Sequence, residues 1–132
     1  MRVLALDYGS ARCGCAVTDP TGMIVTPIAA VLRPASRRGL QALQELVDER
    51  EVERVVVGLP LSLRGTDTDQ TRETRRFAEQ LSLRLGERIP VEMHDERFTT
   101  RIAQREQGPH AESEDSRAAA HLLESWLMSR SR

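Results

Sequence analysis

Short apolar runs bounded by turn-forming residues recur along the chain, and each has the length of a β-strand. Runs of about four to eight residues that end at glycine, proline or aspartate are typical of buried strands. The runs that fit this description are residues 3–6, 13–18, 23–32, 55–58 and 89–93. The sequence therefore predicts five strands, the third of which is interrupted or lies at a sheet edge at Pro27.

Apolar residues with helical spacing fill most of the remaining chain. Leu40, Leu43 and Val47 form one stripe after a helix-start signal at residues 34–36. Similar stretches begin near residues 68, 99 and 113, and the stretch from residue 68 ends at Gly86. The sequence therefore predicts four helices, of which the one from residue 99 is short and ends near Gln107.

The order of these elements determines the kind of sheet they can form. The short link 9–12 and the turn 19–22 make an antiparallel meander of the first three strands. Helices between the later strands require parallel neighbours with right-handed crossovers. The prediction is an α/β fold with a five-stranded mixed sheet, three antiparallel strands followed by βα units, and helices on both faces. This is the ribonuclease H-like architecture, which also occurs in each half of actin-like and sugar-kinase ATPases.

Composition narrows the class of protein further. A chain of 132 residues, 39% hydrophobic and 30% charged, fits one globular domain over residues 1–132. Its apolar runs fall far short of the roughly 20 residues of a membrane helix, so we expect a soluble cytoplasmic protein with no membrane contact. Cys13 and Cys15 are too few and too constrained for a disulfide framework, and we expect them to fill the core.

Acidic residues stand where predicted strands end. Asp7 follows the first strand, Asp95 and Glu96 follow the fifth, and Asp115 lies in the apolar stripe of the last helix. Carboxyl ends of parallel strands meet at one edge of a sheet, so we expect these acids to gather there. Oxygen-only ligands suit Mg²⁺ or Mn²⁺, and two such ions about 4 Å apart support phosphodiester hydrolysis.

Each of these acids also has a purely structural interpretation. Asp7 can serve the turn before Gly9, and Glu96 can pair with a neighbouring arginine at the surface. Asp95 can cap a helix or a turn, and Asp115 is favourable near a helix N-terminus through the helix dipole alone. The expected gathering of these acids at one edge of the sheet favours the metal site.

Four motifs in this order resemble those of the YqgF/RuvX family, over essentially the whole chain. The segments that carry the resemblance are Leu6-Asp7-Tyr8-Gly9 with Gly14 and Ala16, Val57-Gly58-Leu59-Pro60 with Gly65 and Phe77, Asp95-Glu96-Arg97-Phe98-Thr99-Thr100, and Asp115-Ser116-Arg117-Ala118-Ala119 with Leu122-Leu123. The family is similar to Holliday-junction resolvases and is associated with pre-16S rRNA nuclease activity.

The resemblance implies a metal-dependent endonuclease that takes two Mg²⁺ or Mn²⁺ ions. Asp7, Glu96 and Asp115 match the catalytic, metal-binding acids, with Asp95 as an additional ligand. The implied substrate is structured nucleic acid, with processing of the 5′ end of the 16S rRNA precursor in a pre-ribosomal particle as the leading role. Holliday-junction cleavage in DNA recombination and repair is the alternative, and it requires a homodimer rather than a monomer.

Arginines near these motifs are candidates for binding the nucleic acid. All 19 basic residues are arginines in a chain of net charge −1, so any phosphate contact from a basic side chain is a guanidinium contact. The predicted nucleic-acid-binding residues are Arg64, Arg72, Arg97, Thr99, Thr100 and Arg101. The alternative is a solvated helix face, because glutamates are interleaved with these arginines. Few aromatic residues are present, which favours backbone and shape recognition over base stacking.

Two features depart from the family pattern. The segment 108–114 before Asp115 is acidic where the family is often basic, and cysteines occupy positions 13 and 15. Thiolates do not suit Mg²⁺, so a metal role for the cysteines is not expected.

Two other classes of function remain open at this stage. One is an ATP-binding module, since Asp7-Tyr8-Gly9 resembles the first phosphate loop of actin-like ATPases, although those enzymes need two such domains. The other is a non-catalytic RNA-binding factor of ribosome assembly, which the acidic segment and the neutral net charge favour.

Overall fold

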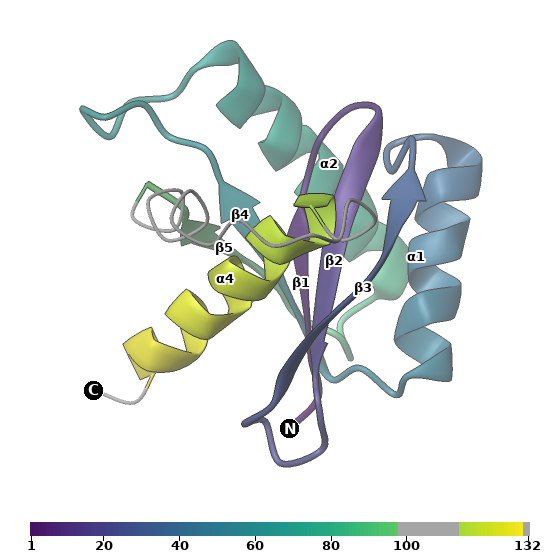
Figure 1. Cartoon of the computed structure of the whole chain (residues 1–132). Helices are drawn as coiled ribbons and strands as arrows, with labels where there is room; N and C mark the ends of the chain where they lie inside the picture. Colours follow the sequence, from purple (N-terminus) through teal and green to yellow (C-terminus); the bar gives the residue numbers. More distant parts are fainter. Residues whose placement is uncertain (98–113, 131–132) are drawn as a thin grey trace.

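The computed structural model describes residues 1–97 and 114–130, which form a sheet with helices packed on it (Figure 1). The elements in chain order are β1 (Val3–Asp7), β2 (Arg12–Thr18), β3 (Val25–Leu32), α1 (Arg37–Glu49), β4 (Arg54–Leu59), α2 (Asp69–Leu85), β5 (Val91–Asp95) and α4 (Glu114–Arg130). The five predicted strands and three of the predicted helices are confirmed. The short helix predicted near residues 99–107 lies outside the described residues.

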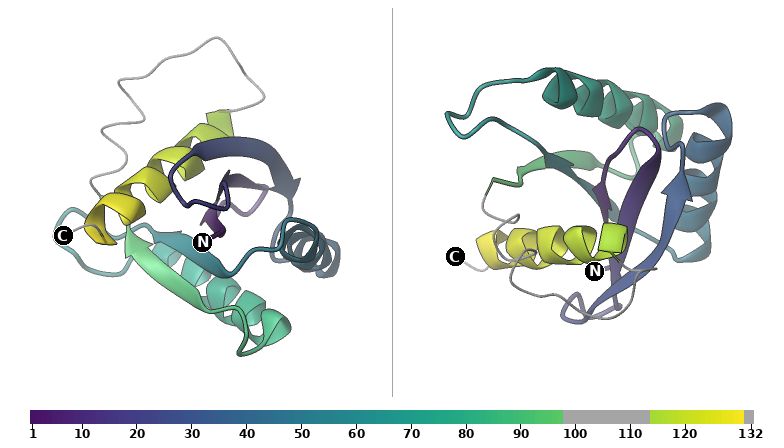
Figure 2. Two further views of the ribbon diagram at one scale, coloured as in Figure 1. Left: turned by 90° about the horizontal axis from the view of Figure 1, so that it is seen from below. Right: turned by 45° about the horizontal axis from the view of Figure 1, so that its top comes forward.

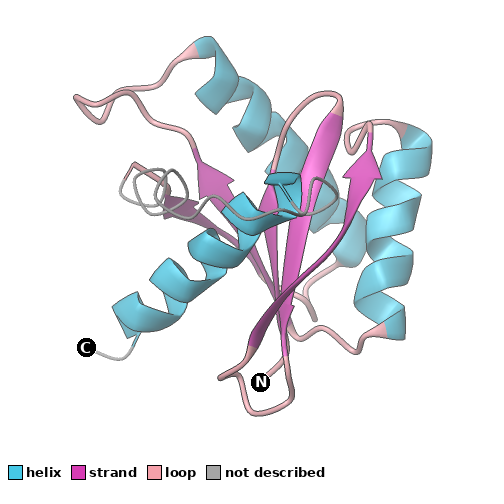
Figure 3. Cartoon of the chain, viewed as in Figure 1, coloured by secondary structure: helices cyan, strands magenta, loops and turns pink. Residues whose placement is uncertain are grey.

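The sheet has the order β3-β2-β1-β4-β5. β1 pairs antiparallel with β2, which pairs antiparallel with β3, whereas β4 is parallel to both β1 and β5. This is the mixed sheet predicted from the order of the elements. As a result the carboxyl ends of β1, β4 and β5 all lie at one edge of the sheet (Figure 3).

Helices cover both faces, as predicted. On one face α1 and α2 pack on Leu4, Leu6 and Val57, and α2 buries its own Phe77 and Leu81 in this core. On the other face α4 is the helix that packs on the sheet among the described residues, and Figure 2 shows it on the side opposite α1 and α2. Strand residues therefore alternate between two cores, one under α1 and α2 and one under α4.

The third and fifth strands are shifted from their predicted bounds. The Asp19 carboxylate accepts hydrogen bonds from the backbone amides of Met23 and Ile24, both at 3.0 Å, so these residues belong to the turn and β3 starts at Val25. At β5, the parallel ladder with β4 runs on to pair Leu59 with Asp95. The strand therefore ends at Asp95 and not at Met93.

The two cysteines lie in the core, as expected. Both thiols are free, and neither residue has measurable exposure (0%). They face α1 and α2, and the strand is irregular between them.

Candidate active site

Two carboxylates come together at the strand-end edge, beneath α4. Asp7 is the last residue of β1, and Glu96 directly follows β5. The backbone amide of Glu96 donates to the Leu59 carbonyl at 3.3 Å, which holds it beside the end of β4. Alternation along the strands puts Asp7 on the same face as Val3 and Ala5, which pack under α4. Asp7 and Glu96 thus flank the end of β4 on one face of the sheet.

Gly58 provides the space that the Glu96 carboxylate occupies. A Cβ atom built on Gly58 would lie 2.1 Å from Glu96 Oε2 and 3.1 Å from Leu122 Cδ2. Any side chain at this position would therefore collide with the carboxylate. The glycine lets Glu96 lie across the backbone of β4, between the strand and α4.

Burial and nearby negative charges both affect the pKa of Glu96. Desolvation raises the pKa of the Glu96 carboxyl to about 7, and the negative charges of Asp7 and Asp95 contribute to the same shift. A nearby cation would stabilise the ionised form of Glu96, because it removes the repulsion between the carboxylates. The two carboxylates are hard oxygen donors and fit Mg²⁺ or Mn²⁺. Among the side chains that the structure describes, no three or more acids, histidines or cysteines are arranged as a metal site. The candidate metal ligands among the described residues are therefore Asp7 and Glu96.

The start of α4 lies at the same edge. Ser116 is fully buried, accepts a hydrogen bond from the backbone amide of Cys15 at 3.3 Å and donates to the Ile28 carbonyl. These contacts fix the first turn of α4 over β2, where Gly14 stands opposite Asp7. The backbone of Asp115 is in this turn, while its side chain lies outside the described part of the chain.

Asp95 binds Arg97 and faces away from Glu96. Its carboxylate accepts from the Arg97 backbone amide at 2.9 Å and from Arg97 Nε at 2.8 Å. These hydrogen bonds hold the pKa of the Asp95 carboxyl below its usual range. Val91 and Met93 of the same strand pack on the α1–α2 side, so alternation puts Asp95 on that side too. The structure therefore brings Asp7 and Glu96 together but turns Asp95 towards Arg97.

Arg97 joins the end of β5 to the loop between β4 and α2. Its Nη1 lies 3.4 Å from the Leu63 carbonyl. At Gly65, which has φ +80°, an added Cβ would lie 3.1 Å from the same nitrogen. The guanidinium thus spans from Asp95 to the loop beside the acidic edge.

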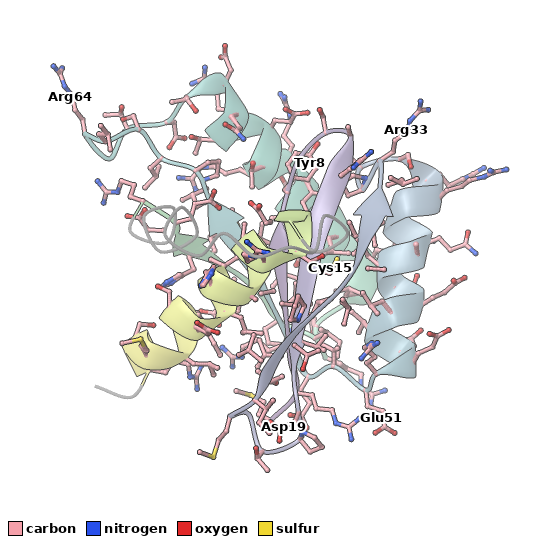
Figure 4. The ribbon with its side chains drawn as sticks, in the orientation of Figure 1. Tyr8, Cys15, Asp19, Arg33, Glu51 and Arg64 are labelled. Atoms are coloured by element: carbon pink, nitrogen blue, oxygen red, sulfur yellow. The ribbon has the colours of Figure 1, made fainter. Side chains whose placement is uncertain are left out.

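The other predicted nucleic-acid-binding residues are more dispersed. Arg64 is exposed at the tip of the β4–α2 loop, and Figure 4 shows it projecting from one flank of the strand-end edge. Arg72 is exposed on the first turns of α2 and forms an ion pair with Asp69. Thr99, Thr100 and Arg101 lie outside the described residues.

The sequence did not reveal how Tyr8, the neighbour of Asp7, is held beside the site. Its ring stacks on Phe77 with the ring centroids 4.5 Å apart, and its hydroxyl donates to the Glu73 carboxylate at 3.1 Å. Burial, followed by this contact, raises the pKa of Tyr8 to about 12. The residue after Asp7 is therefore anchored to α2 by contacts 65 and 69 positions away in the chain, which no local pattern indicates.

The rest of the described chain adds one negative finding. None of its helices combines the length and the apolar composition needed to cross a lipid bilayer.

Two resolvases of known structure share this architecture. RuvC of Thermus thermophilus, solved with a Holliday junction substrate, superposes with a TM-score of 0.64 at 14% identity, over 99% of this chain and 96% of that chain. The fowlpox virus resolvase, also solved with Holliday junction DNA, gives a TM-score of 0.61 at 11% identity, over 100% of both chains. At these identities the likeness defines the fold, which is ribonuclease H-like, as predicted.

Sequence relatives define the family within that fold. A sequence profile of the RuvX family, described as "Holliday junction resolvase", matches residues 1–129. Relatives named "Putative pre-16S rRNA nuclease" include one from Mycobacteroides abscessus, 38% identical over 99% of this chain and 83% of its own length. Another, from Maridesulfovibrio salexigens, is 35% identical over 96% of this chain and 98% of its own length. The chain therefore belongs to the RuvX family, and this membership supports a nuclease, a hydrolase of phosphodiester bonds.

Proposed function

We propose that the protein is a cytoplasmic endonuclease that depends on Mg²⁺ or Mn²⁺ and cuts structured RNA, with the 5′ end of the 16S rRNA precursor as its substrate. The observation that carries the proposal is the pair Asp7 and Glu96 at the strand-end edge, with the pKa of Glu96 raised to about 7 by burial and by its acidic neighbours. The names of the sequence relatives support the RNA substrate.

The proposed roles rest on the family resemblance and on where the described residues lie. Asp7 and Glu96 would hold the metal ions, with Asp115 from the first turn of α4 as the third acid. When bound, such ions supply Lewis-acid stabilisation of the charge that develops on the phosphodiester. Gly58 leaves the space that the Glu96 carboxylate occupies, and Arg97 joins the β4–α2 loop to the end of β5. A guanidinium in this position also has donors suited to a substrate phosphate.

A second candidate function is the cleavage of Holliday junctions. It is favoured by the family description and by the fold, which is that of resolvases solved with junction DNA. Symmetric cleavage of a junction needs two active sites, and hence two copies of this chain. A protein that remains a monomer on the junction would speak against this role.

The proposal is tested by incubating the protein with two labelled substrates, a pre-16S rRNA fragment and a four-way DNA junction, in Mg²⁺ or Mn²⁺. We expect cleavage of the rRNA fragment that needs the metal and that falls at least about 100-fold in Asp7→Asn, because metal ligation is worth several kcal/mol of transition-state stabilisation. Asp48→Asn is the matched control, since Asp48 is an exposed aspartate of α1 away from the edge.

Three results would contradict the proposal. Equal cleavage by Asp7→Asn would place the activity elsewhere. Preferential cleavage of the junction would favour the resolvase. Binding of the rRNA fragment without cleavage of either substrate would favour a non-catalytic assembly factor.

A further inference from the structure

Four arginines gather at one corner of the fold and have no part in the site described so far. Arg12 starts β2, Arg33 follows β3, and Arg37 and Arg38 open α1; all four are exposed. The chain brings them together, since Arg12 is opposite Leu32 in the ladder and the Arg33 amide donates to the Ala11 carbonyl at 2.9 Å. We call these four residues the arginine corner.

The arginine corner lies at the same edge of the sheet as Asp7. Gly14 stands opposite Asp7, and Arg12 is two residues further along β2, or about 7 Å. Arg33 follows β3, two strands across from β1, which places it roughly 15 Å from Asp7. Figure 4 shows Arg33 and Arg64 projecting from opposite flanks of this edge, with Asp19 and Glu51 at the other end of the molecule. The acidic edge therefore has arginines on both sides.

Acids close in the sequence are sparse around Arg33, Arg37 and Arg38. Between residues 8 and 44 the sequence contains a single acid, Asp19, which lies in the turn at the opposite end of the sheet. Within the described residues, none of the ion pairs includes Arg33, Arg37 or Arg38. The chain as a whole has a net charge of −1, so the positive charge at this corner is a local concentration.

The charges at the start of α1 are unfavourable for the helix itself. The first turn of α1 contains no acid and two arginines, although the helix dipole favours negative charge at a helix N-terminus. Arg33 adopts φ 45°, a conformation that is unfavourable for a residue other than glycine. The corner is also tightly built, because a Cβ on Gly39 would lie 2.0 Å from the Arg33 carbonyl oxygen. A cluster of exposed guanidinium groups on a closely packed backbone is suited to a polyanion.

We propose that the arginine corner binds the phosphate backbone of the nucleic acid on the side of the acidic edge away from Arg64. This inference rests on the proposed nuclease function and extends it, because it gives the path of the substrate across the sheet edge. Guanidinium groups pair with phosphate oxygens in a bidentate manner and read no base sequence. The corner thus positions the strand, while the acids at the centre of the edge act on it.

Salt dependence of binding tests the inference. Affinity for a hairpin RNA that includes the precursor cleavage site is measured in EDTA, which prevents cleavage, over a series of salt concentrations. Arg37→Gln/Arg38→Gln is expected to bind roughly 10- to 100-fold more weakly at about 0.1 M salt, with a salt slope smaller by about 1 to 2. Its melting temperature should match or exceed that of the unmodified protein, since two cations leave a helix N-terminus.

The matched control removes the same charge from the other end of the fold. Arg84 and Arg88 are exposed arginines near the end of α2 and the start of β5, so Arg84→Gln/Arg88→Gln should keep the unmodified affinity and slope. An unchanged salt slope of RNA binding in Arg37→Gln/Arg38→Gln would overturn the inference but not the nuclease proposal. It would favour an acidic protein surface as the partner of the arginine corner. Failure of the unmodified protein to bind the RNA would instead overturn the nuclease proposal itself.

Discussion

Gly58→Ala is expected to reduce cleavage at least about 100-fold while the protein stays folded. The new Cβ would lie 2.1 Å from Glu96 Oε2, so the carboxylate must leave its place over β4. The atom displaced is the far end of a flexible side chain, and the contact with Leu122 at 3.1 Å needs only a small adjustment. Overpacking of this kind costs about 1–3 kcal/mol, whereas a shift of about 1 Å in a catalytic group can reduce the rate about 100-fold. The rate of rRNA cleavage and the free energy of unfolding in urea, measured together, check this.

Gly86→Ala is the control for a glycine replacement without a role at the edge. Gly86 ends α2 with φ 79° and has no atom within 4 Å of an added Cβ. Its replacement should lower stability by about 1–3 kcal/mol through backbone strain and leave the cleavage rate unchanged. Equal losses of activity in the two variants, or full activity in Gly58→Ala, would contradict the role of Gly58 in making room for the Glu96 carboxylate.

Glu96→Gln is expected to abolish metal-dependent cleavage and to stabilise the metal-free protein at alkaline pH. Burial raises the pKa of the Glu96 carboxyl from 4.5 to about 7, so the folded protein keeps a proton that the unfolded chain releases. The stability that this proton contributes is complete below about pH 4.5 and is lost as the pH rises through about 7. Glutamine keeps the shape and never ionises. The variant should therefore be up to about 3 kcal/mol more stable than the unmodified protein at pH 8, and less than about 1 kcal/mol more stable at pH 5.

Urea unfolding in EDTA at the two pH values measures this difference, and Glu92→Gln is the matched control. Glu92 lies on the same strand, and its carboxylate pairs with Arg54 at 2.6 Å. Although burial opposes it, the Arg54 contact lowers the pKa of Glu92, so its charge stabilises the fold above its pKa and the variant should lose stability at pH 8. A destabilised Glu96→Gln at pH 8 would contradict the raised pKa that burial and the neighbouring acids give to Glu96.

The architecture was accessible from the sequence because each element carries a local signal. Ser36 and Thr68 cap α1 and α2, as their positions before the apolar stripes indicate. The placement of Asp7 and Glu96 at one edge followed from the topology alone, since β1, β4 and β5 are parallel. The shifted ends of β3 and β5 depended on the side chain of Asp19 and on pairing with β4, which periodicity does not encode.

Contacts between distant residues account for what the sequence did not reveal. Asp95 and Glu96 are adjacent in the chain, yet the structure pairs Asp95 with Arg97 and places Glu96 against Gly58. Strand alternation predicts that two adjacent acids separate, but it does not say which of them faces Asp7, since this depends on where β5 begins. The arginine corner was missed for a similar reason, because Arg12 and Arg33 meet only through the pairing of β2 with β3.

Calorimetric titration of the metal-free protein with Mn²⁺ tests the central claim most directly, because it reports the metal site without a substrate. Metal binding requires an ionised carboxylate and so releases a proton from any ligand that is protonated. With the Glu96 pKa at about 7, metal binding at pH 6 should release close to one proton per protein molecule from this carboxyl, and metal binding at pH 8 almost none. Buffers of different ionisation enthalpy measure this release. We predict that Asp7→Asn weakens binding at least tenfold, that Glu96→Gln also removes the proton release, and that Asp48→Asn changes neither. Mn²⁺ binding that is equally strong in all three variants, or that releases no proton at pH 6, would contradict a metal site built on Asp7 and Glu96.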